Sequence, residues 1–272
     1  MTGGWTPQRV LDAAAAWVWV PPDAVDHDLE EYRLTYYPDR TSVQSSRSER
    51  PAAQLVDEVL AKVRADGRTS LRWWVSDATR PADTERELRA SGFVLVETVD
   101  VLAWELGDAA TPRLPRLDVP CDVTVHPVTD EAGVRLAAAV DADVFDWSPA
   151  TEAQIGDRVR RVEEAVRTGH WPEFQYVACV GGLPAGAGGC TMAGDVARLW
   201  GAGVHEAYRG RGAYRALLDA RMRRAHELGA TLALVKGRVG TSGPILRRAG
   251  FTAYGQERCY QLDDVAGRAE RR

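Results

Sequence analysis

The chain has 272 residues, of which 45% are hydrophobic and 27% are charged; this composition is typical of a folded globular protein large enough for two modest domains. The formal net charge of −5 argues against a general nucleic-acid-binding protein, because such proteins need a basic surface. Arginines cluster in two helical segments and are expected on solvated helix faces: Arg221, Arg223 and Arg224, then Arg247 and Arg248. The composition therefore predicts no nucleic-acid partner.

The cysteines and the N-terminus exclude further classes of protein. Cys121, Cys179, Cys190 and Cys259 are scattered without CxxC pairs, so neither a disulfide framework nor a metal site is expected. The N-terminus lacks a basic region followed by a long apolar run, and no stretch approaches the ~20 apolar residues of a membrane span. We therefore expect a cytoplasmic protein with no membrane partner and no metal.

In chain order, the first half contains an amphipathic helix at 55–67, a strand from Leu71, a short helix around Leu88, and extended chain after Gly92-Phe93. The segment that follows, DAATPRLPRLDVP, holds three prolines and has no apolar periodicity, which is typical of a linker. The predicted domain organisation is a first domain at 1–107, a linker at 108–120, a second domain at 121–263 and a frayed tail at 264–272.

The second half alternates helices and strands in the manner of an α+β sheet. It begins with a strand at 123–127 and helices at 130–141 and 151–168, which are joined by the connection DADVFDWSPA. The later elements are strands at 174–180, 185–192 and 196–204, a helix at 213–228, a strand at 231–236, a short helix at 244–249 and extended stretches within 251–262.

The two halves share a weak internal repeat. Residues 71–104 and 232–262 align on Gly92-Phe93 and Gly250-Phe251, and each shows a strand, a connection, a helix and then extended chain. Upstream of each, an amphipathic helix ends at a glycine. The repeat predicts a duplicated fold.

The segment 203–218, GVHEAYRGRGAYRALL, runs from an apolar strand into a loop of glycine and arginine that opens a helix. Backbone N–H groups at a helix start, the helix dipole and close-approaching glycines together favour a phosphate group. Gly210 and Gly212 permit that approach, and Arg209 and Arg211 add charge. Neither a Walker loop nor GxGxxG is present, so nucleoside triphosphates and NAD are not the expected ligands.

This segment resembles the GNAT superfamily of acyltransferases, whose signature is V-x-P-x-x-R-G-x-G-x-G/A at the end of a strand. Residues 204–214 match most of it, and 246–251 match a second family feature, L-x-x-x-G-F. The order and spacing of elements agree across 123–262, about half of the chain. The resemblance implies an α+β fold with a mixed, mostly antiparallel sheet flanked by helices. The C-terminal copy would be complete, and the N-terminal copy partial, as in tandem GNAT proteins.

The resemblance further implies an N-acetyltransferase that moves an acetyl group from acetyl-CoA to a primary amine of a small molecule or peptide by direct attack. The partners would be acetyl-CoA and the amine acceptor, acting on a monomer or homodimer. The pantetheine arm would lie along an opening of the sheet beside 200–204, where the N–H of Val204 or a neighbour polarises the thioester carbonyl. The implied coenzyme-binding residues are Ala202, Gly203, Val204, Arg209, Gly210, Arg211, Gly212, Ala213, Tyr214 and Ser242.

The sequence departs from the family pattern at two positions. Tyr214 stands where a glycine or alanine is usual, and Leu246 stands where many members carry a tyrosine that protonates the leaving thiolate. These departures keep open an alternative, a non-catalytic acyl-CoA-binding regulatory protein. In the first half, the stretch YPDRTSVQSSRSERPAAQL holds no glycine, which predicts a degenerate copy without a pyrophosphate loop.

Candidates for proton transfer come from two places in the chain. His205 follows the strand directly and suits a base, although it equally suits a surface turn. Glu257 and Tyr260 can line the acceptor cleft as base and acid, or form cross-strand surface pairs. Tyr254 and Tyr208 are possible acids, or half-buried residues at the edge of the core, and Glu206 is open to the same two interpretations as His205. Ser242 can contact the coenzyme or cap the short helix.

The connection 141–147, DADVFDW, concentrates acids and aromatic residues where family members often place acceptor-binding residues. Asp143, Asp146 and Trp147 would then form an acidic, aromatic lip that suits a cationic amine. Asp141, Asp143 and Asp146 can instead cap helices, and the sequence does not separate these two interpretations.

Overall fold

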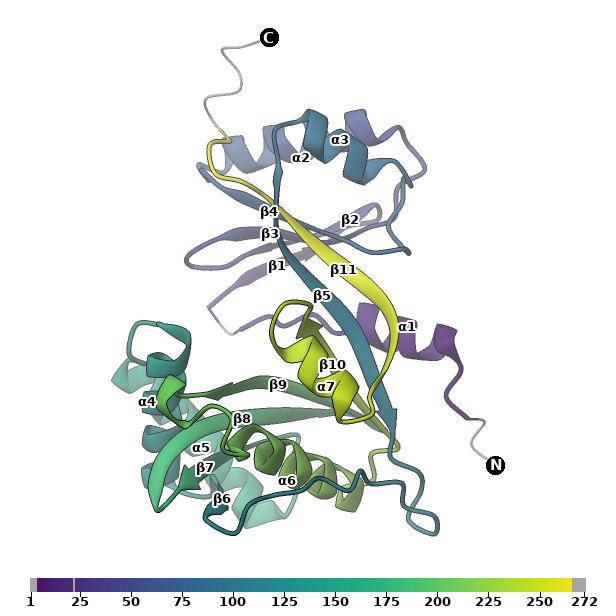
Figure 1. The fold of residues 1–272 in the computed structure, drawn as a ribbon. Coiled ribbons are helices and arrows are strands. Elements are labelled where there is room, and N and C mark those ends of the chain that lie inside the picture. The colour runs from purple at the N-terminus through teal and green to yellow at the C-terminus, as the bar shows by residue number, and fades with distance from the viewer. Residues whose placement is uncertain (1–3, 22, 266–272) are drawn as a thin grey trace. The chain divides into compact units, whose positions relative to one another are not determined.

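The computed structural model describes residues 4–21 and 23–265 (Figure 1). The first half holds α1 (Pro7–Ala15), β1 (Val25–Asp28), β2 (Tyr32–Tyr36), β3 (Thr41–Ser46), α2 (Ala52–Ala65), β4 (Leu71–Val75), α3 (Thr84–Ala90) and β5 (Val94–Glu105). The second half holds β6 (Val123–Pro127), α4 (Glu131–Phe145), α5 (Glu152–Thr168), β7 (Glu173–Val180), β8 (Leu183–Ala193), β9 (Val196–Val204), the 3-10 helix η1 (Glu206–Tyr208), α6 (Ala213–Glu227), β10 (Leu232–Arg238), α7 (Ser242–Arg248) and β11 (Thr252–Leu262). Within the described ranges, no helix has the length and apolar character needed to cross a membrane.

Two compact units share these elements, and neither unit is one continuous piece of sequence. The C-terminal unit contains residues 4–6, Leu102–Lys236 and Leu246–Thr252. The N-terminal unit contains Pro7–Val101, Gly237–Ile245 and residues 253–265. This division differs from the predicted boundary at 108–120, because β11 pairs antiparallel with β4 from Leu262↔Leu71 to Arg258↔Val75. Such pairing between distant segments leaves no mark on local composition.

The predicted frayed tail begins too early in the sequence. Val265 is fully buried in the core of the N-terminal unit, and its backbone N–H donates to the carbonyl of Thr69 at 2.9 Å. Its own carbonyl accepts a hydrogen bond from Arg64 Nε at 2.6 Å. The chain is therefore held through residue 265, and the remainder of the predicted tail, 266–272, lies outside the described residues.

Among the described residues, hydrogen-bonded strands follow the order β1-β2-β3-β4-β11-β5-β10-β9-β8-β7-β6. Neighbours β3 and β4, and likewise β9 and β10, are parallel. The pairs β1/β2, β2/β3, β4/β11, β6/β7, β7/β8 and β8/β9 are antiparallel. The predicted α+β class with a mixed, mostly antiparallel sheet is confirmed.

The internal repeat is also visible in the strand geometry. Strands β2-β3-β4 and β8-β9-β10 each contain an antiparallel pair followed by a parallel pair. In each set the middle strand carries one extra residue, a β-bulge. In β3 it is Gln44, between the pairs Leu34↔Val43 and Arg33↔Ser45. In β9 it lies at Gly201, whose φ is 57°, between Gly189↔Trp200 and Ala187↔Gly203.

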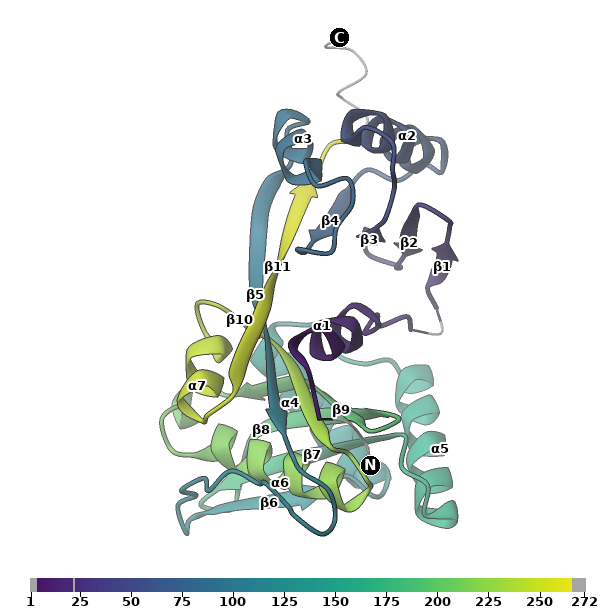
Figure 2. The ribbon, with the colours of Figure 1, turned by 90° about the vertical axis from the view of Figure 1, so that its right-hand side faces the viewer.

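Helices cover both faces of the sheet in the C-terminal unit (Figure 2). Alternate residues of a strand point to opposite faces. Ala178 and Val180 of β7 pack in a cluster with Ala213, Ala216 and Leu217 of α6. The intervening residues of β7, Val177 and Cys179, pack with α4 and α5 through Val134, Ala137, Ala138 and Ile155. The central strands are therefore held from both sides.

Two local predictions in the second half need correction. The helix predicted to end near Asp141 continues as α4 to Phe145, so Asp143 is helical and not part of a loop. Gly203 explains the extension, since a Cβ at that position would come within 2.3 Å of Val144 Cγ1, and glycine there lets the last turn of α4 pack closely on β9. The extended stretches near 251–262 form one long strand, β11.

Candidate functional site

Strands β9 and β10 diverge along their length. Their parallel pairing runs from Val196↔Leu232 to Arg198↔Leu234, whereas β9 continues to Val204 and stays paired with β8 as far as Gly186. Successive backbone N–H groups of a strand point to opposite sides. The N–H of His205 donates to Ala185 on the β8 side at 2.8 Å, so the N–H of Val204 is directed to the diverging side. An extended ligand arm can lie along this side of β9.

The loop after β9 opens α6 with an uncapped helix start. Gly210 and Gly212 have φ angles of 78° and 91°, a left-handed conformation that favours glycine. No side chain caps the start of α6 at Gly212, so the backbone N–H groups of the first turn remain directed outward. A Cβ on Gly212 would lie 2.4 Å from Pro120 Cδ, whereas a Cβ on Gly210 would meet nothing within 4 Å. The loop is therefore a backbone cradle of the kind that binds phosphate groups.

Tyr214 does not obstruct this cradle. Its side chain packs against the core cluster that contains Leu218 and Met222, and burial raises the pKa of its phenol. Because the ring is directed inward, the tyrosine leaves the outer side of the first helical turn unobstructed. The departure from glycine or alanine at this position is therefore compatible with the backbone role of the loop.

A pocket of about 520 Å³ lies beside the loop. Its lining comes from the end of α4, from Pro184 and from the segment 205–209. Within it, Nδ1 of His205 lies 2.5 Å from Oδ2 of Asp143, and three-quarters of the His205 side chain is buried. Of the predicted site residues, the structure thus joins His205, Asp143 and Arg209 in one pocket. Glu206 and Tyr208, further candidates for proton transfer from the sequence, also line it.

Residues predicted in this region also make contacts within the chain. The guanidinium of Arg211 pairs with Asp122 at 2.9 Å, and Arg209 Nε donates to the carbonyl of Val204 at 3.3 Å. Asp146 ends α4 in the left-handed conformation with φ 53°. Trp147 is 60% exposed and stacks on Phe145 with ring centroids 4.6 Å apart.

The remaining candidates for catalysis lie on β11, in the N-terminal unit. Tyr260 is fully buried, and its hydroxyl donates to Glu85 Oε1 at 2.5 Å and accepts from Arg89 Nη2 at 2.7 Å. Burial and the bond to Glu85 raise the pKa of Tyr260, so the phenol is a structural group and a poor acid. Tyr254 and Glu257 are half-buried on the same strand and stay predictions.

Ser242 also lies in the N-terminal unit, at the start of α7. Its Oγ accepts a hydrogen bond from the backbone N–H of Arg238 at 3.0 Å. This contact joins α7 to the end of β10, in agreement with the alternative that Ser242 orders the start of the helix. A coenzyme contact by Ser242 stays a prediction.

The N-terminal unit differs from the C-terminal unit at the equivalent position. Beyond the β3/β4 pairs, Arg80 bridges to the chain after β3: its N–H donates to Ser46 at 3.0 Å, and its carbonyl accepts from the N–H of Ser48 at 3.2 Å. Glu31 accepts hydrogen bonds from Ser48 Oγ at 2.5 Å and from Arg50 Nε at 2.8 Å, just before α2. The chain's own groups thus engage the segment that leads into the helix.

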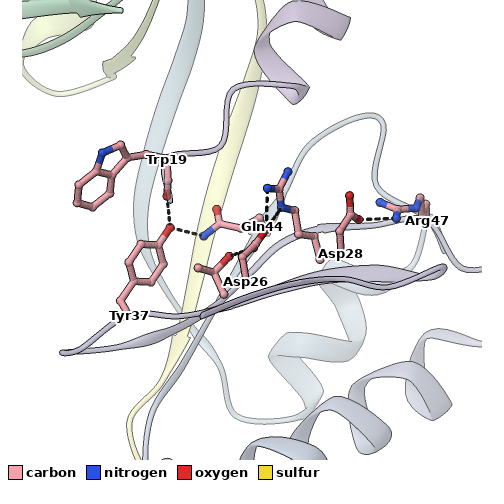
Figure 3. Close-up of polar contacts among 8 residues, drawn as sticks. Trp19, Asp26, Asp28, Tyr37, Gln44 and Arg47 are labelled. Carbon is pink, nitrogen blue, oxygen red and sulfur yellow. Dashed lines mark hydrogen bonds and ion pairs between the residues drawn. The ribbon is translucent and has the colours of Figure 1, made fainter. Parts of the chain in front are cut away.

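Neighbouring polar groups of the N-terminal unit are likewise paired among themselves (Figure 3). Arg47 pairs with Asp28 at 2.7 Å. The hydroxyl of Tyr37 donates to the carbonyl of Trp19 at 2.7 Å and accepts from Gln44 Nε2 at 2.9 Å. These contacts order the surface around β1 to β3.

Asp141 is a buried carboxylate and not part of an acceptor lip. Gln175 Nε2 donates to its Oδ2 at 2.9 Å, and Arg158 Nη2 lies 4.0 Å from the same oxygen. Burial raises the pKa of Asp141, and these two partners offset the effect only in part. The residue holds α4 against β7 and α5.

Replacing Asp141 with asparagine should remove a pH-dependent loss of stability. A folded-state pKa above the unfolded value means that stability is fully present below the unfolded pKa, about 3.9, and is lost as pH rises through the folded pKa. The melting temperature of Asp141→Asn relative to the wild type should therefore increase as pH is raised from 4 to 7. Asp39→Asn, at a 70% exposed side chain, is the control. A difference in melting temperature between the wild type and Asp141→Asn that stays constant with pH would contradict the expectation.

The predicted position of Arg221 on a solvated helix face is wrong. The residue was expected on a solvated helix face with Arg223 and Arg224, yet it is 1% exposed. Its side chain donates to the carbonyls of Leu217, Gly189 and Trp200. The sequence feature that could have indicated a buried Arg221 is the glycine pair of β8, since Gly188 and Gly189 leave room for large side chains on both faces of that strand.

Comparisons with known proteins agree with this geometry. Residues 141–240 match the model of the acetyltransferase (GNAT) family. No curated protein sequence matches the chain. Among solved structures, a GCN5-related N-acetyltransferase from Kribbella flavida is similar over 88% of this chain and 89% of its own, with 18% identity and a TM-score of 0.64. One from Sphaerobacter thermophilus is similar over 87% and 81%, with 16% identity and a TM-score of 0.62.

A tandem GNAT protein from the clavulanic acid biosynthesis pathway is similar over 97% of this chain and 91% of its own, with 16% identity and a TM-score of 0.61. At such identities the structural matches establish the fold, and the family model identifies the segment that contains the loop and the pocket. Residues 141–240 therefore match the acetyltransferase (GNAT) family, and the fold of the chain is similar to that of a tandem GNAT protein.

Proposed function

We propose that this protein transfers an acetyl group from acetyl-CoA to a primary amine of a small molecule or peptide. The observation that carries the proposal is the arrangement, in one compact unit, of an uncapped glycine loop, a diverging strand and a pocket with a paired histidine. These three features correspond to a phosphate cradle, a track for an extended arm and a place for proton transfer. Together they fit acetyl-CoA and an amine better than any one of the three alone.

The backbone of the loop and of β9 would hold the coenzyme. N–H groups of 210–214 are suited to the pyrophosphate, because the left-handed glycines and the helix start direct them outward. The N–H of Val204 points to the diverging side of β9, where it can donate to the carbonyl oxygen of a bound thioester. When bound, acetyl-CoA supplies an acyl group activated as a thioester.

His205 would act as the base. With Nδ1–H donating to Asp143, Nε2 carries the lone pair and can accept a proton from the attacking amine. A carbon–nitrogen bond forms as the carbon–sulfur bond breaks, and the sulfur leaves with the bonding electrons. Solvent supplies its proton, since Leu246, at the usual position of the acid, is a buried core residue.

The N-terminal unit would bind no coenzyme. Arg80 closes the strand side that stays open in the C-terminal unit, and the carboxylate of Glu31 lies where the chain enters α2. A second pyrophosphate at this place would lie beside the carboxylate of Glu31, and the nearby guanidinium of Arg50 is already paired with that carboxylate. We therefore assign one acetyl-CoA site to each chain.

The alternative, a non-catalytic acyl-CoA-binding regulatory protein, has one observation in its favour. Leu246 is 1% exposed among apolar neighbours, so its place in the fold holds no proton donor. Both functions require coenzyme binding, and only the enzyme releases free thiol with an amine. The identity of the amine is therefore the decisive question.

Calorimetric titration of acetyl-CoA into the full chain should give one site. A panel of primary amines, including diamines, amino sugars and peptide N-termini, should then contain a compound that produces free CoA faster than the no-amine control. Binding without thiol release across the panel would favour the regulatory protein. Absence of binding would overturn both functions, and two sites per chain would overturn the assignment to one unit.

A further inference from the structure

Arg221 is a buried cation without a carboxylate partner. It lies on α6, and in the described part of the chain its hydrogen bonds go to backbone carbonyls alone: Nε to Leu217 at 3.0 Å, and Nη1 to Gly189 at 3.1 Å and Trp200 at 3.3 Å. Burial lowers the pKa of the guanidinium, but the ordinary value is so high that the charge is kept. Burying a charge in this way is costly, and a methionine would fill similar space without that cost. A role for the charge would explain why an arginine is buried at this position.

The surroundings of Arg221 are built to admit it. A Cβ on Gly188 would lie 3.2 Å from Cζ of Arg221, and a Cβ on Gly189 would lie 2.3 Å from the Trp200 ring. These neighbouring glycines face opposite sides of β8, because side chains of a strand alternate. Strand β8 thus runs between a guanidinium on the α6 side and an indole on the other. Residues larger than glycine at either position would displace one of these groups.

The guanidinium meets β9 at its bulge. A bulge interrupts the ladder and leaves carbonyl groups without their usual partners. Nη1 of Arg221 bridges the carbonyls of Gly189 on β8 and Trp200 on β9, directly before Gly201. One arginine therefore fixes the two strands at the point where β9 bends.

This contact also acts on the electrostatics of β9. The carbonyl of Trp200 and the N–H of Gly201 belong to one peptide unit, so a cationic donor at the oxygen polarises that unit. The bend it fixes precedes Val204, whose N–H is directed to the diverging side of the strand. Arg221 thus combines a mechanical contact with a permanent charge behind the segment that would bind the thioester.

We propose that Arg221 is a positioning residue for acyl transfer, which holds the bulge of β9 so that the backbone N–H of Val204 is aimed at the thioester carbonyl and polarises it. The inference rests on the proposed function of the same site. It differs from a purely structural role because it requires a change in the bound carbonyl group itself. A structural role alone would affect melting temperature and leave that carbonyl unchanged.

The test uses the full chain and acetyl-CoA labelled with ¹³C at the thioester carbonyl. Hydrogen bonding to a carbonyl lowers its stretching frequency, so infrared difference spectra of the bound label measure the polarisation directly without an acceptor. The variants are Arg221→Met and Arg221→Lys, with Arg223→Met on the same helix as the matched control, since Arg223 is half-exposed and pairs with Asp219. Calorimetry gives the affinity of each variant for acetyl-CoA.

We expect a lowered carbonyl frequency in the wild type and in Arg223→Met, and loss of most of that shift in Arg221→Met with affinity changed less than about fivefold. Once an acceptor is known, kcat should fall about 10- to 100-fold, less than or equal to the loss of a direct oxyanion donor. Arg221→Lys keeps a charge, but its ammonium ends one bond short of the position of Nη1 and it has no donor in place of Nε, so it should lose part of the shift. If Arg221→Met does not fold, Arg221→Lys serves as the test variant.

The inference would be overturned if folded Arg221→Met showed the same carbonyl frequency shift as the wild type. If Arg221→Met does not fold, an unreduced shift in Arg221→Lys would overturn it. Either result would leave the proposed function standing. Failure of the wild type to bind acetyl-CoA would instead overturn the proposed function, and the inference with it. The two failures are therefore distinguishable in one set of measurements.

Discussion

His205→Gln should lower kcat with the identified amine by about 10²- to 10⁴-fold, the usual contribution of a general base. Glutamine has a similar size and can still hydrogen-bond Asp143, but it cannot take a proton from the amine. Affinity for acetyl-CoA should change little, because the loop that would hold the pyrophosphate is separate from the imidazole.

Asp143 provides a second arm of this experiment. Asp143→Asn removes the carboxylate that faces Nδ1 at 2.5 Å, and it should lower kcat by a smaller factor than His205→Gln. Because the two residues act as a unit, the double variant should be no slower than His205→Gln alone. His170→Gln, an exposed histidine of the same unit, is the control. A His205→Gln variant with at least half of the wild-type kcat would remove His205 as the base.

Gly210→Val should weaken acetyl-CoA binding by at least about tenfold. An L-residue in the left-handed conformation costs roughly 1–2 kcal/mol, and a β-branched residue costs more, so the loop should leave the conformation that directs its N–H groups to the phosphates. The position has open space around it, which makes a steric effect on the core unnecessary. Calorimetry with acetyl-CoA measures the change directly.

A matched control lies at the other end of the same helix. Gly229 has a φ of 95°, and a Cβ there would also meet nothing within 4 Å. Gly229→Val should therefore lower the melting temperature by a comparable amount while binding acetyl-CoA like the wild type. Gly212 is a poor choice for this test, since a Cβ there would collide with Pro120. Equal affinity in the Gly210 and Gly229 variants would contradict the assignment of the loop.

Much of the fold was predictable because its signals are local. The strand, glycine loop and helix of 203–218 lie within one short segment, and the glycines of the loop indicate positions where the backbone can adopt positive φ angles. The capping box of α5, in which Thr151 and Gln154 hydrogen-bond each other's backbone N–H groups, is likewise encoded in neighbouring residues. Element types in the second half were therefore predicted well, and their ends less well.

The division into units was not predictable from the same signals. Proline content marked 108–120 as a linker, but β11 completes the sheet of the N-terminal unit by pairing with β4. Its sequence, TAYGQERCYQL, mixes polar and apolar residues, and this pattern does not identify the partner strand. The same limit misplaced Tyr260, whose hydroxyl meets Glu85 and Arg89 of α3.

The sequence by itself determined the class of fold, the internal repeat and the glycine loop before α6, because each depends on periodicity or on backbone conformations that neighbouring residues dictate. Only the tertiary structure decided which side chains meet. It paired His205 with Asp143, buried Asp141 beside Gln175, and placed Arg221 under the bulge of β9. Such contacts depend on how distant elements pack. The sequence pattern of a helix is the same whether a charged residue faces solvent or the space beside a glycine of another strand.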